Sequence, residues 1–162
     1  MMCISTRGRY ATRILVLLAG LAPDETMTKQ EIAVSENLTP GYVQQLMTPL
    51  QAAGLVLSHR GKQGGFRLAR SPETVTVAEA LRVMEGECRL VPCHDGENCD
   101  RIAICPTRPI WVGAAMVLEN YFRQTTIADL AKQAEILADA AEPIAIPAGV
   151  GPPAHKEKGA RV

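Results

Sequence analysis

The chain has 162 residues, of which 47 % are hydrophobic, and its 17 lysines and arginines balance 17 aspartates and glutamates. This composition excludes a disordered or collagen-like chain, and no apolar run approaches the roughly 20 residues of a membrane span. Five cysteines are an odd number, so we expect a reducing, cytoplasmic location in preference to a secreted disulfide framework.

The first predicted helix begins after a cap at Ser5 and ends near Leu21. Its basic start and the apolar run ILVLLAGLA at 14–22 are similar to a secretory signal. The run is short, however, and Ile14 and Leu18 recur at the spacing of one buried helix face. We therefore expect a helix of a soluble domain and no export.

A helix-turn-helix is predicted next. Thr28 and Glu31 have the spacing of a capping box, and they begin a short helix over TKQEIAVSE. Thr39 is a natural N-cap for a third helix, with Pro40 at its first position and Gly54 at its left-handed end. The buried face of this third helix is predicted to comprise Val43, Leu46, Met47 and Leu50.

Two alternating stretches, 55–59 and 66–70, predict strands, and RGKQGG between them predicts a basic, glycine-rich hairpin tip. Three helices followed by a hairpin are the order of a winged helix-turn-helix domain. The predicted fold is therefore mainly α with a small β-hairpin, and residues 1–72 form its DNA-binding domain.

The second half is predicted to be helical around a cysteine segment. Thr76 and Glu79 form a second capping box, the helix ends at Gly86, and the cysteine segment occupies about 87–106. A long helix at 109–123 follows, with apolar positions near heptad spacing at Trp111, Ala115, Leu118 and Phe122. We expect this apolar face to be covered by a partner.

A last helix is expected from Thr126 and Asp129 to about Ala141. Beyond it, the chain is rich in proline and glycine without a period, so we expect residues 141–162 to be a disordered tail. Residues 73–140 are then expected to form one unit, which combines the cysteine loop with the dimerisation helices.

Charge is divided unevenly along the chain. Residues 1–72 hold eight lysines and arginines against four acidic residues, whereas residues 73–162 hold nine against thirteen. A basic winged helix suits double-stranded DNA: glutamines can read adenine edges, and capped helix ends and wing cations can hold phosphate. The candidates are Thr39, Gly41, Tyr42, Gln44, Gln45, Arg60 and Lys62. The alternative is that these residues form only the solvated face of a protein-binding winged helix.

Cys93, Cys99 and Cys105 follow one another at intervals of six residues. Three loop thiolates could hold an iron-sulfur cluster, [2Fe-2S] or [4Fe-4S], whose remaining ligand is weaker than cysteine. Structural zinc is the second choice, because the spacing lacks C-x2-C pairs and leaves a tetrahedral ion one ligand short. Free thiols or a thiol-disulfide switch are the third. An electron carrier is disfavoured by the winged helix, and no constellation for catalysis is present, so we do not expect an enzyme.

Several motifs together resemble the Rrf2 family of bacterial transcription factors. They are the start MMCISTRGRYATRILVLLAGLA, the segment LTPGYVQQLM with the wing HRGKQGGFRLAR, the C-x5-C-x5-C spacing, Trp111 and the late TTIADL. The resemblance covers about residues 1–140. It implies a homodimer on a palindromic operator, with the helix at 109–123 crossing its mate and a cluster held by the three cysteines near that interface. It also maps DNA contact onto Gly41, Gln44, Gln45 and Arg60.

Three positions depart from the pattern of known members. Gln44 replaces a glutamate of the cluster-assembly regulator, and Arg108 replaces its ligating histidine. Arg9 replaces an aspartate of the nitric-oxide sensor, and an arginine cannot ligate iron. The candidates for a fourth ligand are therefore His94 or Cys88, and after them Glu87, Asp95, Glu97, Cys3 of the partner subunit or an exogenous ligand.

The predicted function is a cytoplasmic DNA-binding regulator, acting as a repressor, that senses iron-sulfur status, redox state or nitric oxide. The alternative is a cluster-free winged-helix regulator that uses a thiol switch or structural zinc.

Overall fold

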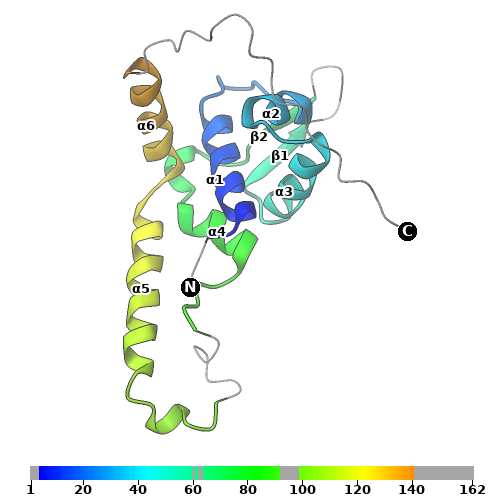
Figure 1. Cartoon of the computed structure of the whole chain (residues 1–162). Helices are drawn as coiled ribbons and strands as arrows, with labels where there is room; N and C mark the ends of the chain where they lie inside the picture. Colours follow the sequence, from blue (N-terminus) through cyan, green and yellow to red (C-terminus); the bar gives the residue numbers. More distant parts are fainter. Residues whose placement is uncertain (1–3, 60, 62–63, 92–98, 141–162) are drawn as a thin grey trace, which may run out of the picture.

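The computed structural model describes residues 4–59, 61, 64–91 and 99–140. These residues form a mainly helical fold with one two-stranded antiparallel hairpin, which confirms the predicted class (Figure 1). The elements are α1 (Thr6–Ala19), α2 (Lys29–Glu36), α3 (Pro40–Ala52), β1 (Val56–His59), β2 (Gly65–Leu68), η1 (Pro72–Thr74), α4 (Val77–Glu85), η2 (Ile102–Ile104), α5 (Arg108–Gln124) and α6 (Ile127–Ala140).

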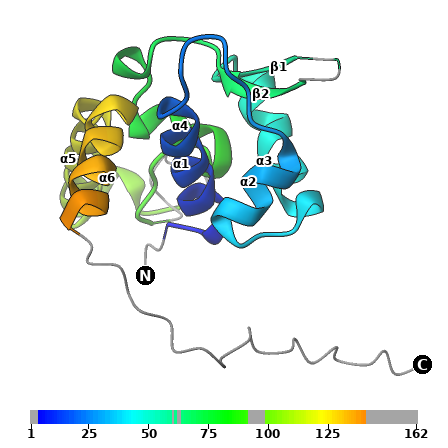
Figure 2. The same ribbon diagram turned by 90° about the horizontal axis from the view of Figure 1, so that it is seen from above.

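Helix α1 is the centre of the fold. Viewed from above, it lies between α5 and α6 on one side and α2, α3 and the hairpin on the other (Figure 2). Its side chains Ala11, Ile14 and Leu15 are fully buried, as a helix packed on several sides requires. The predicted cap is present, because the Ser5 hydroxyl accepts a hydrogen bond from the Gly8 amide at 3.3 Å.

The helix-turn-helix is built as its sequence predicts. Thr28 and Glu31 form both bonds of a capping box at the start of α2, and Pro40 is the first residue of α3. The predicted inward face of α3 is buried. Gly54 follows the helix with φ of 68°, a left-handed conformation that costs glycine little. The inner face of α3 is therefore anchored in the core along the length of the helix.

The hairpin is fastened to the loop between α1 and α2. Its register pairs Val56 with Leu68 and His59 with Gly65. In addition, Met27 and Phe66 form an isolated antiparallel bridge, with N–H···O distances of 3.0 and 2.8 Å. The sequence patterns did not indicate this bridge. It makes the wing part of the winged-helix body.

The chain leaves this body after α4 and returns through α5. The segment 125–127 then pairs with 75–77: the Ile127 amide donates to the Val75 carbonyl at 2.8 Å and the Val77 amide donates to the Thr125 carbonyl at 2.9 Å. Ile127 is fully buried, and α6 packs against α1. The winged-helix core is thus completed by residues that follow the cysteine segment in sequence.

Helix α5 projects from the body as an arm (Figure 1). Of its predicted apolar face, Ala115 is buried against its own chain, and Phe122 lies beside α4 residues. Trp111, also predicted on that face, remains exposed, as do Ile110, Met116, Val117 and Tyr121. The predicted tail at 141–162 lies outside the described residues. None of the helices in the described ranges is both long enough and apolar enough to span a membrane.

Candidate DNA-binding face and cysteine arm

The first turn of α3 presents most of the predicted DNA-binding residues. The Thr39 hydroxyl accepts a hydrogen bond from the Tyr42 amide at 3.2 Å, which confirms the predicted cap. Gly41, Gln44 and Gln45 are exposed, and no atom within 4 Å would meet a Cβ at Gly41. A nucleic-acid backbone could therefore approach this turn closely, and both glutamine side chains lie on the exposed side of the helix.

Thr48 contacts Gln44, a pair that we did not predict. Its hydroxyl donates to the Gln44 carbonyl at 2.9 Å, and the Gln44 side-chain amide lies 3.5 Å from the same hydroxyl. One turn of helix separates these residues, so i, i+4 spacing was the signal that could have identified the pair.

Tyr42 is half-buried and is joined to α1. Its ring meets the Tyr10 ring edge-on, with centroids 6.2 Å apart, and the Arg13 guanidinium lies 5.4 Å from the Tyr10 centroid. Arg13 Nε also lies 2.7 Å from Oε2 of Glu36 in α2, whose side chain is only 9 % exposed. The sequence offered one signal for this burial: Glu36 follows the buried Ile32 by four residues and so shares its face of α2.

The wing is described in part. Arg60 and Lys62, the two predicted wing cations, lie outside the described residues. Among those described, Gly61 has φ of 124°, as a tight hairpin tip requires. Arg67 Nε donates to His59 Nε2 at 2.8 Å. Arg67 is therefore a further cation on the wing, and it was not among the predicted DNA-binding residues.

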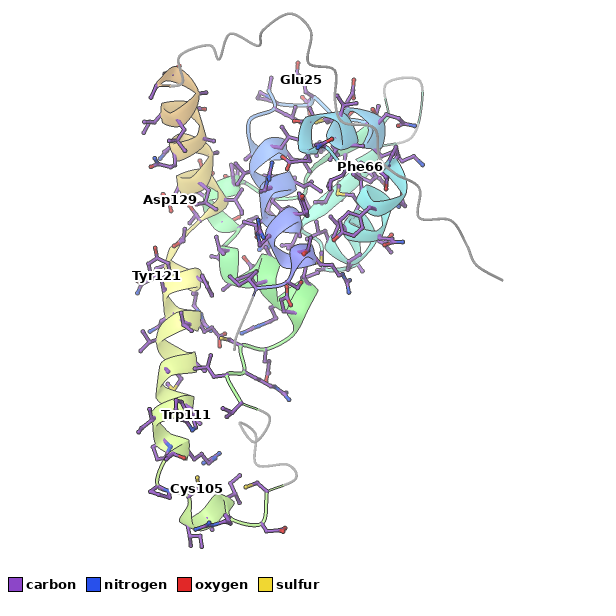
Figure 3. The ribbon with its side chains drawn as sticks, viewed as in Figure 1. Glu25, Phe66, Cys105, Trp111, Tyr121 and Asp129 are labelled. Atoms are coloured by element: carbon purple, nitrogen blue, oxygen red, sulfur yellow. The ribbon has the colours of Figure 1, made fainter. Side chains whose placement is uncertain are left out.

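Cys105 lies just before α5, at the end of this helix that is far from the winged-helix body. Cys105 is at the tip of the arm, whereas Phe66 marks the body (Figure 3). Cys99 and Cys105 are half-buried, while Cys93 and His94 lie outside the described residues. A hydrogen bond with the Thr107 hydroxyl and bonds from the backbone at Thr107 and Arg108 lower the pKa of the Cys105 thiol. These contacts therefore increase the share of thiolate at Cys105 relative to an ordinary cysteine, and the thiolate is the form that binds iron or zinc.

Cys88 lies beside α5 near Glu119, away from Cys105. Burial, and then the nearby Glu119 carboxylate, raise the pKa of the Cys88 thiol. Because α5 advances about 16 Å between Arg108 and Glu119, Cys88 and Cys105 are not brought together. No group of three potential metal ligands is present in the parts of the chain that the structure describes.

An ion-pair network joins α4 to α5 close to Cys88. Arg82 of α4 pairs with Glu119 of α5, and Arg123 also contacts Glu119, at 2.8 Å. Hydrogen bonds from Arg123, opposed by burial and supported by the charge of Arg82, lower the pKa of Glu119. The carboxylate therefore stays ionised and holds two helices together.

Comparison with known proteins finds one family of regulators over most of the chain. The Rrf2 family, described as iron-dependent transcriptional regulators, matches residues 4–133. The chain is 34 % identical over 130 residues to the regulator CymR of Bacillus subtilis, covering 80 % of this chain and 90 % of CymR. It is 33 % identical over 137 residues to the protein Rrf2 of Nitratidesulfovibrio vulgaris, covering 83 % and 91 %.

Two solved structures have the same fold. CymR of B. subtilis, titled the global cysteine regulator, superposes with a TM-score of 0.69 at 33 % identity, covering 82 % of this chain and 98 % of that one. The IscR structure from T. potens has a TM-score of 0.69 at 30 % identity, covering 84 % and 90 %.

Proposed function

Because this chain belongs to the Rrf2 family of transcriptional regulators, we propose that it is a homodimeric repressor whose cysteine arm reports iron-sulfur status, redox state or nitric oxide to the DNA-binding face. The observation that carries the proposal is the separation of the two sites. The residues of α3 proposed to contact DNA lie on the body, and Cys105 lies at the tip of a helix that is ion-paired to α4. Its relatives are named as transcriptional regulators, in agreement with the expectation that it is not an enzyme.

On the DNA side, the proposal assigns contact with a palindromic operator to Thr39, Gly41, Tyr42, Gln44, Gln45, Arg60 and Lys62. The exposure of Gly41 and both glutamines supports it, as does their place at the start of α3, because the positive end of a helix dipole attracts phosphate. Residues 1–72 would form the DNA-binding domain, and residues 73–140 would supply the sensor and the dimer contacts.

On the sensor side, Cys93, Cys99 and Cys105 would hold the cluster. The donor type fits, because hydrogen bonds at Cys105 lower the pKa of its thiol and thiolates are the usual ligands of iron-sulfur clusters. His94 is the fourth ligand that we favour, since Cys88 lies beside Glu119 at another level of α5. When bound, such a cluster supplies a centre that reacts with oxidants and nitric oxide.

The exposed side of α5 supports the dimer. Ile110, Val117 and Tyr121 are each more than 60 % exposed, and their spacing of seven and four residues places them on one side of the helix. An exposed apolar stripe on a helix commonly marks an interface. We expect the cytoplasmic protein to pair through this stripe.

The proposal is tested by anaerobic purification with iron and sulfide analysis, and by binding to operators selected from random DNA duplexes. Cys105→Ser should lose the iron and change operator affinity, whereas Cys88→Ser, the matched control, should retain both. A colourless, iron-free wild-type protein with normal operator binding would refute the cluster.

A second candidate is a cluster-free thiol switch, which the lowered pKa of Cys105 favours. One relative, CymR of Staphylococcus aureus, is described in an oxidized form. Under this candidate, the anaerobic protein contains no iron, and peroxide changes operator binding only while Cys105 is present. Zinc at the same cysteines would instead appear in metal analysis of protein produced in iron-poor medium.

A further inference from the structure

The outer face of the hairpin carries an arginine that is held by a neutral partner. The strand register places Leu57 directly opposite Arg67, and His59 follows Leu57 by two residues, so these three side chains lie on one face. Val56 and Phe66, on the other face, are buried in the core. Across the strands, Arg67 Nε donates to His59 Nε2 at 2.8 Å.

The neutral partner leaves the charge of Arg67 uncompensated. An imidazole nitrogen that accepts a hydrogen bond carries no proton, so His59 orients the guanidinium without cancelling its charge. Within the described parts of the chain, Arg67 forms no ion pair, whereas Arg70 pairs with Glu79 of α4 at 2.7 Å. Because only Nε is engaged, the two terminal amino groups of Arg67 remain available as donors.

The surroundings of Arg67 along the chain are free of carboxylates. No acidic residue lies between Glu36 and Glu73 in the sequence. This stretch comprises α3 and the hairpin, which pack against each other and lie on the same side of α1 (Figure 2). It also contains every residue to which DNA contact is assigned above. An anion that approaches Arg67 therefore meets no carboxylate from either α3 or the hairpin.

We propose that Arg67 binds a phosphate of the DNA backbone and that His59 is the residue that positions it. This inference rests on the proposed DNA-binding function. A phosphate accepts two parallel hydrogen bonds from a guanidinium group, and an arginine that is already oriented loses less side-chain freedom on binding. Because a phosphate contact carries no base information, Arg67 should strengthen binding to every duplex by the same factor.

The test of the phosphate contact is duplex binding by the full-length protein over a series of potassium chloride concentrations, with a selected operator and an unrelated duplex. In Arg67→Gln, the slope of log K against log salt concentration should become shallower by about 0.9 for each bound subunit. Both duplexes should lose about tenfold in affinity per subunit, the scale of one charged hydrogen bond. Arg70→Gln, the matched control, removes the same charge from a residue paired with Glu79 and should leave the slope unchanged.

The test of positioning uses substitutions at His59. His59→Ala should weaken binding to both duplexes about threefold by releasing the guanidinium. His59→Gln, whose side-chain carbonyl can accept from Nε, should restore the wild-type affinity. In an Arg67→Gln background, His59→Ala should have no further effect. Arg67→Lys, which keeps the charge but lacks Nε, should retain the salt slope and be equally insensitive to His59→Ala. Thermal melting confirms that each variant folds.

Each part of the proposal can fail separately. A wild type that binds both duplexes, with an Arg67→Gln slope equal to its own or a loss confined to the operator, overturns the phosphate contact alone. Equal losses from His59→Ala and His59→Gln, or a loss from His59→Ala that persists without Arg67, overturn the positioning role. A wild-type protein that binds no duplex at any salt concentration refutes the proposed function, and this inference with it.

Discussion

Gly65 lies where the wing meets the loop between α1 and α2. A Cβ at this position would come within 2.7 Å of the Met27 carbonyl oxygen and 2.8 Å of its carbon. Gly65→Ala must therefore separate Met27 from Phe66 and break their two backbone bonds. We expect a loss of about 2 kcal/mol in the free energy of unfolding, measured by urea denaturation, together with weaker operator binding through a displaced wing.

Gly20→Ala is the matched control for this substitution. Gly20 ends α1 with ordinary helical angles, and its nearest contact to an added Cβ is at 3.6 Å. Its stability should change by no more than about 0.5 kcal/mol. Equal stability of the two variants would contradict the role given to the Met27–Phe66 bridge.

Cys88 and Cys105, two of the three described thiols, should differ in reactivity. In metal-free protein near neutral pH, iodoacetamide should modify Cys105 faster than Cys88, because the pKa of Cys105 is lowered, that of Cys88 is raised, and the thiolate is the nucleophile. Peptide mass spectrometry measures the two rates. Thr107→Val removes the hydroxyl contact and should slow modification of Cys105 alone; a faster Cys88 would contradict these assignments.

Among the elements, α4 illustrates how a helix start responds to pH. Burial raises the pKa of Glu79, but bonds with Arg70 and Thr76 outweigh it and lower the pKa below the ordinary 4.5. The ionised cap therefore stabilises the fold fully above pH 4.5, and this stabilisation is lost as the pH falls through the lower folded value.

Glu79→Gln should accordingly cost about 1 kcal/mol at pH 7, the scale of a lost cap, because the half-exposed Arg70 pair adds little. The cost should shrink as the solution is acidified. Denaturation at several pH values measures it, with Asp139→Asn, an equal change of charge on α6, as the control. A cost that does not depend on pH would contradict the contribution of the ionised cap.

The elements also show what could be predicted from the sequence. The capping boxes at Thr28 and Thr76 and the α3 face were correct because they depend on residues within one or two turns. The Met27–Phe66 bridge and the Arg13–Glu36 pair were missed because they join segments that only tertiary packing brings together. For α5, heptad spacing predicted an apolar helix but could not distinguish the side that packs on α4 from the exposed side.

For the whole molecule, the exposed stripe on α5 predicts how two copies associate. Val117 is 70 % exposed, so Val117→Arg should leave the fold intact and weaken self-association about a hundredfold through an unpaired charge in the interface. Sedimentation over a concentration series measures this effect. Val34→Arg, at a position 83 % exposed on α2, should leave the dimer unchanged. Equal behaviour of the two variants would place the interface elsewhere.

The arm also acts as a lever. Helix α5 is about 25 Å long, and the described ion pair that joins it to α4, between Arg82 and Glu119, lies in its second half. About 16 Å of helix separates this attachment from Arg108. A tilt of about 5° at the attachment therefore moves the cysteine end by about 1.4 Å. The same ratio applies in reverse, so a displacement of about 1.4 Å at Cys105 turns the base of the arm by about 5°. Under the proposed function, a change at the tip would thus reach the winged-helix body as a small rotation of the arm.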